Sequence, residues 1–363
     1  MSDARTLVLA REAGAAAALA PVAERLRDDG ICDVCAVAEE RAVEVLARAG
    51  LPVLGFPRDP STEQVAALLT RERVGALLTG TSLWPRRDNR WWSAARTAGV
   101  PSVAVVDHWV NPVQRFSDAQ PFDCLPDVVA VPDEVAADAL ARHGMPCERL
   151  RVTGQPYFDD LVRRAVGVDR SQARRSLGLD PGRRVVVFAS EPQASHYGAS
   201  DAAELFRGYT EHDALGLLLD ALVRVAPDAL AVVKLHPLED PGTFEALAAD
   251  RGGIDVRVLA ACPVPALIAA ADAVVGMTSV LLLEAALAGA PTLSVRPHGR
   301  DEFPFAHAEL MESLTDPAAL PAALAALLQR PRGPATADFS AGAVDRVVAL
   351  VRPSLRPSEV PLP

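Results

Sequence analysis

Two short motifs in the second half of the chain carry residue types that could hold a phosphate. The first is VVKLHP at 232–237, which contains His236 and Lys234, the only lysine of the sequence. Arginine has replaced lysine everywhere else, so the one retained lysine is a candidate for a specific role. An ammonium group and an imidazole at a strand end could stabilise a departing phosphate. The alternative is a histidine that the backbone satisfies, with Pro237 as an ordinary strand terminator.

The second motif, Gly276-Met277-Thr278-Ser279, follows a short apolar strand and opens a predicted helix. The two hydroxyls and the unpaired N–H groups of a helix start favour a phosphate. Glu284 lies about one and a half turns into this helix, where a carboxylate could accept hydrogen bonds from a ribose. The simpler reading is an ordinary N-cap followed by a solvated glutamate. The apolar neighbours of Glu284 favour a functional role, because a lone buried carboxylate is costly.

Apolar strands alternate with helices in both halves of the chain. In the first half we expect strands at 6–10, 31–37, 51–56, 76–79, 102–106 and 128–131. In the second half we expect strands at 183–189, 256–259, 273–276 and 291–295, and another that ends at His236. Thr210 and Asp213 form a capping-box pattern before a helix at 215–225. Helices of roughly ten residues between such strands predict parallel sheets covered on both faces.

The length of 363 residues and an apolar content of 50% predict two domains with separate cores. A Gly-Gln-Pro break near 155 marks the boundary, so we expect Rossmann-like domains at 1–155 and 156–335. A helix within 336–352 is expected to pack back on the first domain, and the proline-rich tail 353–363 is expected to be flexible. The predicted fold class is therefore α/β, with two Rossmann-like domains facing across a cleft that binds substrates.

Charge and composition argue against several classes of protein. The formal net charge is −11 and the pI is near 5.2, so the surface as a whole would not attract nucleic acid or an anionic membrane. We find neither a secretory signal nor an apolar stretch long enough for a transmembrane helix, and we expect a cytoplasmic protein. Five cysteines are scattered along the chain, and Cys32 and Cys35 fall in an apolar run that predicts buried, inert thiols.

Both phosphate motifs resemble segments of known enzyme families. The run GMTSVLLLEAALAGAP at 276–291 resembles the donor-nucleotide segment of GT-B glycosyltransferases and of UDP-N-acetylglucosamine 2-epimerases. This resemblance implies that the hydroxyl-rich loop contacts the diphosphate and that Glu284 binds the ribose. The Lys-x-His-Pro run at 234–237 resembles the His-Pro motif of bacterial sialyltransferases, capsule transferases and glycerophosphotransferases of this fold. It implies that His236 contacts the donor phosphate and that Thr278 and Ser279 complete the pocket.

The resemblance implies a glycosyltransferase that moves a sugar from a nucleotide-activated donor to a small-molecule or glycan acceptor. The acceptor would bind to residues 1–155 and the donor to residues 156–335. The leaving nucleotide would be stabilised by His236, Lys234 and the helix start, without a metal and without a cofactor besides the nucleotide-sugar co-substrate. The sequence has no Asp-x-Asp segment of the metal-dependent type, which agrees. The sequence leaves open whether the chain forms a homodimer.

Further polar residues follow other predicted strands of the second half. Ser190 could meet a phosphate and Glu191 could hold a sugar hydroxyl, although a plain turn explains both equally well. Arg296 and Asp301 belong to the loop after the strand 291–295. The resemblance implies that this loop reaches the donor sugar, and the alternative is an ordinary polar surface loop.

The first half offers candidates for the acceptor site. Gly14 lies in the loop that takes the place of the glycine-containing acceptor loop of GT-B enzymes, although the usual double glycine is missing. Asp107 and His108 end a predicted strand, and either could act as the base that removes the acceptor's proton. The alternative for this pair is an Asx turn beside a structural histidine. Trp91 and Trp92 could stack on a sugar or belong to the core.

Two other functions remain open from the sequence. A UDP-sugar 2-epimerase-like isomerase would share the layout, but that family carries a denser set of catalytic carboxylates and a Ser-Gly-Gly where this chain has residues 277–279. A non-catalytic nucleotide-binding protein of the same fold is the third reading. The nucleotide base is also open, because the His-Pro resemblance favours cytidine and the segment around Glu284 favours uridine.

Overall fold

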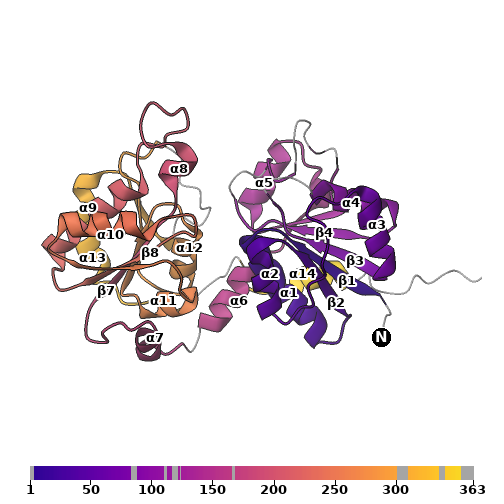
Figure 1. Cartoon of the computed structure of the whole chain (residues 1–363), viewed down its shortest axis with the longest axis horizontal. Helices are drawn as coiled ribbons and strands as arrows, with labels where there is room; N and C mark the ends of the chain where they lie inside the picture. The colour runs from indigo at the N-terminus through magenta and orange to yellow at the C-terminus, as the bar shows by residue number, and fades with distance from the viewer. Residues whose placement is uncertain are drawn as a thin grey trace, which may run out of the picture. The chain divides into compact units, whose positions relative to one another are not determined.

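A computed structural model describes residues 4–82, 88–109, 113–116, 122, 124–165, 168–300, 310–334 and 340–352. The chain divides into two compact units: unit 1 comprises Met1–Asp160 and Ala337–Pro363, and unit 2 comprises Leu161–Thr336. Each unit is built on a six-stranded parallel sheet with helices on both faces (Figure 1). The predicted α/β class with two Rossmann-like domains is therefore confirmed.

The sheet of unit 1 has the strand order β2-β1-β3-β4-β5-β6. Its strands are β1 Arg5–Ala10, β2 Val34–Ala38, β3 Val74–Thr79, β4 Ser102–Val105, β5 Val128–Val131 and β6 Leu150–Val152. Its helices are α1 Ala13–Asp28, α2 Glu40–Arg48, α3 Thr62–Arg71, α4 Asp88–Thr97, α5 Glu134–Arg142, η1 Cys147–Arg149 and α14 Ala343–Val351, and α6 Pro156–Ala165 leads into unit 2.

The core of unit 1 depends on small residues that let α1 approach the sheet closely. Ala15, Ala16 and Ala18 of this helix are almost fully buried against the sheet. A Cβ on Gly80, just after β3, would lie 2.4 Å from the Cβ of Ala15, so this loop tolerates only glycine. Helix α14 packs on α1, with Val347 fully buried in the same cluster.

The expected strand at 51–56 is wrong. Val53 makes one isolated bridge to Ala36, and Leu54 donates a single backbone bond to the Ala36 carbonyl at 2.7 Å. Pro52 has no N–H to donate to a ladder, so the segment cannot extend beyond this edge contact. The apolar residues that suggested a strand pack beside β2 instead, and Leu51 is buried.

The sheet of unit 2 has the strand order β12-β11-β10-β7-β8-β9. Its strands are β7 Val185–Ala189, β8 Leu230–Lys234, β9 Asp255–Leu259, β10 Ala273–Gly276, β11 Thr292–Val295 and β12 Glu312–Leu314. Its helices are α7 Arg170–Ser176, α8 Gln193–Tyr197, α9 Glu211–Val225, α10 Pro241–Arg251, α11 Val264–Ala270, α12 Val280–Leu287, η3 Pro317–Ala319 and α13 Leu320–Leu327.

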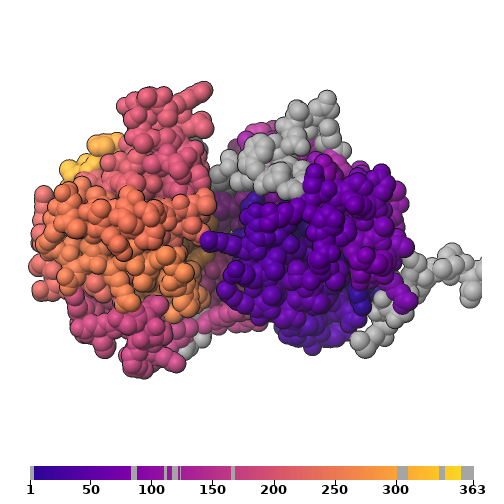
Figure 2. Space-filling view, in the orientation of Figure 1, coloured from indigo at the N-terminus to yellow at the C-terminus, as the bar shows by residue number. Residues whose placement is uncertain are grey.

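The two faces of this second sheet carry different helices. Helices α9 and α13 pack on one face, where Val186, Phe188 and Val233 are fully buried, and α10 packs beside α9. Helices α7, α11 and α12 form the other layer. The segment around α8 projects from the surface of unit 2 (Figure 2), and Leu205 in the following loop is 66% exposed. Among the described helices, none is both long and apolar enough to cross a bilayer.

Candidate functional site

Three loops of unit 2 meet at the carboxyl edge of its sheet. Strand β7 lies between β10 and β8, with Ala189 paired to Gly276 on one side and to Lys234 on the other. The loops that follow these three strands carry Glu191, Thr278 and His236. The sheet therefore brings together the two motifs that the sequence predicted to share a site, at the edge where α/β sheets bind ligands.

A carboxylate occupies part of the expected phosphate position. Glu191 accepts hydrogen bonds from the backbone N–H of Thr278 and, at 2.9 and 3.1 Å, from its hydroxyl. Gln193 donates its side-chain N–H to the same hydroxyl oxygen at 3.1 Å. Burial raises the pKa of the Glu191 carboxyl above its ordinary value, while the two Thr278 donors oppose that shift. Thr278 thus holds a protein anion rather than standing open for a ligand.

The start of α12 still offers donors beyond Thr278. Ser279 is the N-cap, and its hydroxyl oxygen accepts a long bond of 3.4 Å from the N–H of Leu281. Within the described part of the chain, no group accepts a hydrogen bond from the N–H of Ser279 or Val280. These two N–H groups lie at the positive end of the helix, which suits an anion.

A glutamate that the sequence analysis missed organises the His-Pro loop. Glu239 accepts the backbone N–H of His236 at 2.6 Å through one oxygen and the hydroxyl of Ser190 at 2.7 Å through the other. The His236 carbonyl accepts the Glu239 N–H at 3.0 Å, which closes a turn with Pro237 at its exposed corner. Burial raises the pKa of the Glu239 carboxyl, and its two donors oppose the shift.

The hydrogen bonds of this loop also select one form of the His236 ring. The ring nitrogen Nδ1 accepts the N–H of Leu238 at 3.3 Å, so in the neutral imidazole the proton belongs on Nε2. Ser190 and Glu191 are neighbours in the chain, and each is bonded to a different loop. The loop after β7 is therefore bonded both to the His236 loop, through Ser190 and Glu239, and to the start of α12, through Glu191 and Thr278.

Lys234 and Gly276 lie on the same sheet face, because residues paired across parallel strands point the same way. The ammonium group of Lys234 donates to the Leu235 carbonyl at 2.5 Å and lies close enough to Cys262 to influence its thiol. A Cβ on Gly276 would lie 2.8 Å from the Ala189 carbonyl oxygen. Gly276 therefore allows close packing of β10 against β7, which gives it a structural reason to be glycine.

Two other predicted residues of unit 2 are buried. Glu284 is 8% exposed inside α12, which excludes the simple reading as a solvated helix residue. Arg296 is 5% exposed and directs its guanidinium to the Ser313 hydroxyl of β12 at 3.2 and 3.4 Å, away from β7. Asp301 lies outside the described residues.

A second polar cluster lies at the carboxyl edge of the sheet in unit 1. Asp107, just after β4, accepts a bond of 2.6 Å from Arg115. The same guanidinium nitrogen donates to the Thr81 hydroxyl at 3.0 Å. The other Asp107 oxygen lies 2.7 Å from the place where a Cβ on Gly14 would be, so it rests against the first turn of α1. Arg115, which the sequence analysis missed, thus fixes the orientation of Asp107.

His108 is partly buried beside this pair. The pKa of its imidazole is lowered to about 4, chiefly by burial and also by the charge of Arg115, while Asp107 acts in the opposite direction. The ring is therefore neutral at pH 7 and able to accept a proton. Its neighbour Trp109 donates an indole N–H to Asp133 at 2.6 Å.

A buried ion-pair group lies at the same edge and was also missed from the sequence. Arg11, after β1, is within 3.2 Å of Asp88 and 3.5 Å of Glu39. Asp88 accepts the backbone N–H of Ser82 at 3.0 Å, and burial raises its pKa while Arg11 opposes the shift. This group ties together the segments that follow β1, β2 and β3 at the carboxyl edge of the sheet.

Other candidates belong to the core. Trp91 and Trp92 are each 1% exposed, and Trp92 donates to the Thr79 hydroxyl at 3.1 Å, so neither can stack on a sugar. Cys32 and Cys35 are buried, and burial raises the pKa of the Cys35 thiol to about 11. Among the described residues, no three His, Cys, Asp or Glu side chains are grouped to bind a metal ion.

Comparison with known proteins identifies the fold. No protein-family model matches the sequence, and no curated protein matches it. Solved structures do match over nearly the whole chain. The UDP-GlcNAc 2-epimerase of Neisseria meningitidis bound to UDP-GlcNAc aligns with a TM-score of 0.65 at 14% identity, covering 95% of this chain and 99% of that one.

Two further structures have the same architecture. Anabaena HepE in complex with UDP-glucose aligns with a TM-score of 0.61 at 16% identity, covering 97% of this chain and 98% of that one. Acinetobacter baumannii MurG aligns with a TM-score of 0.57 at 15% identity, covering 96% of this chain and 99% of that one. At these identities the likeness shows the fold, which is the GT-B type that the sequence predicted.

Proposed function

We propose that the chain is a nucleotide-sugar glycosyltransferase whose unit 2 binds the donor. The observation that carries the proposal is that adjacent residues of one loop hold both motifs. Glu191 accepts from Thr278, while Ser190 donates to Glu239, which also accepts the backbone N–H of His236. These contacts tie a helix start with unused N–H groups and the loop that carries the His236 imidazole to the same loop, and a helix start and an imidazole are both groups that stabilise phosphate.

In this proposal the donor diphosphate binds at the start of α12. The N–H groups of Ser279 and Val280 donate to one phosphate, and the Ser279 hydroxyl adds a third donor. His236, with its proton on Nε2, donates to the phosphate that leaves with the nucleotide. Lys234 contributes positive charge from the sheet face that it shares with Gly276. Stabilising the leaving phosphate lowers the barrier to breaking the bond between sugar and phosphate.

The acceptor binds to unit 1 in the same proposal. Transfer requires a group that takes the acceptor's hydroxyl proton, and the neutral His108 is the better candidate than Asp107. The carboxylate of Asp107 is engaged by Arg115 and rests against α1. Its negative charge then serves to stabilise the imidazolium that forms on His108. Asp107 remains in the site as the partner of His108 rather than as the base itself.

A second candidate function is a UDP-sugar 2-epimerase. The observation that favours it is the TM-score, which is 0.65 for the Neisseria 2-epimerase and 0.57 to 0.61 for MurG and HepE. Three carboxylates at the carboxyl edge of the sheet in unit 1, those of Asp107, Asp88 and Glu39, take part in ion pairs with arginine. We therefore place the epimerase second.

One experiment separates the functions. The protein is incubated with UDP-GlcNAc alone, and then with nucleotide sugars of different bases together with a panel of sugar and lipid-free glycan acceptors. Nucleotide release that depends on an acceptor supports transfer. Inversion at C2 of UDP-GlcNAc without an acceptor, followed by NMR, would replace the transferase with the epimerase. Nucleotide binding without either reaction would leave a non-catalytic binding protein.

A further inference from the structure

A pocket of about 720 Å³ lies at the opposite, amino edge of the sheet in unit 2. Its wall is formed by residues just before β7, β8 and β10, by α7 and by the end of α9. Its charged lining residues are Arg170, Arg174, Arg183, Arg184, Asp228 and Asp272. A volume of this size is typical of small-molecule sites.

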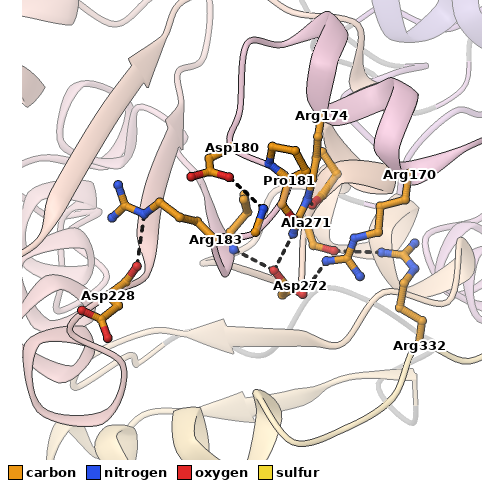
Figure 3. Close-up of polar contacts among 12 residues, drawn as sticks. Arg170, Arg174, Asp180, Pro181, Arg183, Asp228, Ala271, Asp272 and Arg332 are labelled. Atoms are coloured by element: carbon orange, nitrogen blue, oxygen red, sulfur yellow. Dashed lines mark hydrogen bonds and ion pairs between the residues drawn. The ribbon is translucent and has the colours of Figure 1, made fainter.

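Part of the arginine cluster in this pocket has a structural role (Figure 3). Arg174 donates to the carbonyls of Ala270 and Pro181 and to Asp272, at 2.6 to 3.0 Å. Asp272 also accepts the Val185 N–H at 2.7 Å, which holds the amino ends of β7 and β10 together. Arg183 is similarly committed to the Asp228 and Ala229 carbonyls and to Asp255. These two guanidinium groups have few donors left for a ligand.

Two other arginines keep unused donors. Arg170 is paired with Asp272 through one terminal nitrogen, while its Nε is buried and no described residue accepts from it. Arg184 is exposed, and its side chain has no hydrogen-bond or ion-pair partner among the described residues. The lining holds four arginines against two aspartates, and Asp255 outside the lining pairs with Arg183, so one more arginine than carboxylate remains.

This combination determines the kind of ligand. A guanidinium matches the geometry of phosphate oxygens and can donate two parallel hydrogen bonds to them. Val225 and Pro227, which also line the pocket, offer apolar surface for the rest of a small molecule. The carbonyl end of α9 disfavours an anion on that side, so the charged group belongs with the arginines.

We propose that this pocket binds a phosphorylated small molecule through Arg170 and Arg184, separately from any nucleotide at the carboxyl edge. The site does not depend on the proposed transferase activity, because none of its residues belongs to the His236 or Thr278 loops. A ligand here contacts α7 and the starts of β7 and β10, the strands whose other ends carry Glu191 and Thr278.

Inorganic pyrophosphate is the probe, titrated by calorimetry into the full chain at constant ionic strength. We expect Arg184→Gln to weaken binding by at least about tenfold, the loss of one charge-assisted hydrogen bond. Arg170→Gln should weaken it similarly, with thermal unfolding measured alongside because this change also loosens Asp272. The matched control is Arg175→Gln, an exposed arginine of α7 outside the pocket lining, which should change affinity by less than about twofold.

His236→Gln separates this site from the carboxyl edge, and it should leave the binding that depends on Arg184 intact. Pyrophosphate affinity that Arg184→Gln does not change would overturn the proposal. So would equal weakening by Arg175→Gln, which would mean general charge attraction, or complete loss of pyrophosphate binding in His236→Gln. Nucleotide binding is measured separately. Failure of the pyrophosphate site at the amino edge therefore shows in the pyrophosphate titration, and failure of the proposed function shows in the nucleotide titration and the transfer assay.

Discussion

Glu191 and Thr278 form the contact that most directly links the two motifs of unit 2. The carboxylate of Glu191 accepts both the backbone N–H and the hydroxyl of Thr278, two residues before α12 begins. The Glu191 carboxylate thus occupies two donors that a phosphate at this helix start would use. A donor diphosphate has to bind next to this charge or displace it.

We predict opposite effects of Glu191→Gln on stability and on nucleotide affinity. Losing the charge-assisted bonds to Thr278 should lower the free energy of unfolding by about 1–2 kcal/mol. Removing a like charge from the phosphate site should tighten UDP binding severalfold. Chemical denaturation and calorimetry measure the two quantities. Glu211→Gln is the control, because Glu211 is also buried and accepts a backbone N–H, from Ala194 at 2.8 Å. This control should lose stability without gaining affinity, and weaker UDP binding in Glu191→Gln would contradict the account.

The sequence predicted the local features of unit 2 better than the contacts between its loops. Thr210 and Asp213 form the expected capping box, and Ser279 caps the helix that follows β10. These signals act over three residues or fewer, so they can be read directly from the chain. The bond between Glu191 and Thr278 joins residues 87 positions apart and depends on the pairing of β7 with β10.

Residues missed from the sequence also depend on such long-range pairing or on loops. Glu239 follows His236 by three residues, a spacing that could have predicted a side chain folding back on the strand end. Arg115 gave no comparable signal, because no local sequence pattern predicts a bond to Asp107, eight positions earlier in the chain. The error at 51–56 has a local cause: apolar content suggested a strand, and Pro52 prevents a ladder there.

Glu239 should act by positioning His236. We predict that Glu239→Ala lowers UDP affinity by about tenfold, because the His-Pro loop loses both its tie to Ser190 and its backbone bond at His236. Glu239→Gln keeps one acceptor oxygen and should recover part of the loss. The control is Glu245→Ala, an exposed glutamate on α10. Equal affinity in Glu239→Ala and wild type, measured by calorimetry, would show that the loop does not need this carboxylate.

Gly14→Ala tests the position of Asp107. The new Cβ would lie 2.7 Å from the Asp107 carboxylate, so Asp107 must move and its bond to Arg115 must distort. We expect a loss of about 1–3 kcal/mol in the free energy of unfolding. Turnover should fall more than donor affinity, because the nucleotide binds to the other unit in our proposal. Gly55→Ala, where the added Cβ meets nothing within 4 Å, should change neither quantity. An unchanged turnover in Gly14→Ala would remove Asp107 from the site.

The titration of His108 predicts how stability depends on pH. Its pKa is lowered to about 4 in the folded chain, so the unfolded chain binds a proton more readily. The stabilising contribution of the neutral ring is complete above about pH 6.5 and is lost as the pH falls towards 4, by up to about 3 kcal/mol. His108→Gln should reduce this slope when unfolding is measured at several pH values, whereas His143→Gln, at an exposed histidine, should not. An unaltered slope in His108→Gln would mean that the ring is not buried in its neutral form.

The same pKa makes a separate prediction for catalysis. If His108 is the base, transfer should stay nearly constant from pH 8 down to about 5 and decline only near pH 4, because the ring stays neutral until then. The rate is measured with saturating donor, in the pH range where the enzyme remains folded. A decline centred near pH 6.5 would assign the base to an unperturbed histidine elsewhere.

The central claim is that His236 and the start of α12 hold the phosphates of one nucleotide. Calorimetric titration of UDP, CMP, GDP and dTDP into wild type and His236→Gln tests it directly. The account predicts that at least one of them binds at one site per chain, and that His236→Gln weakens this binding by about tenfold or more. If none of the four binds, or if the variant binds as tightly as wild type, the claim is contradicted.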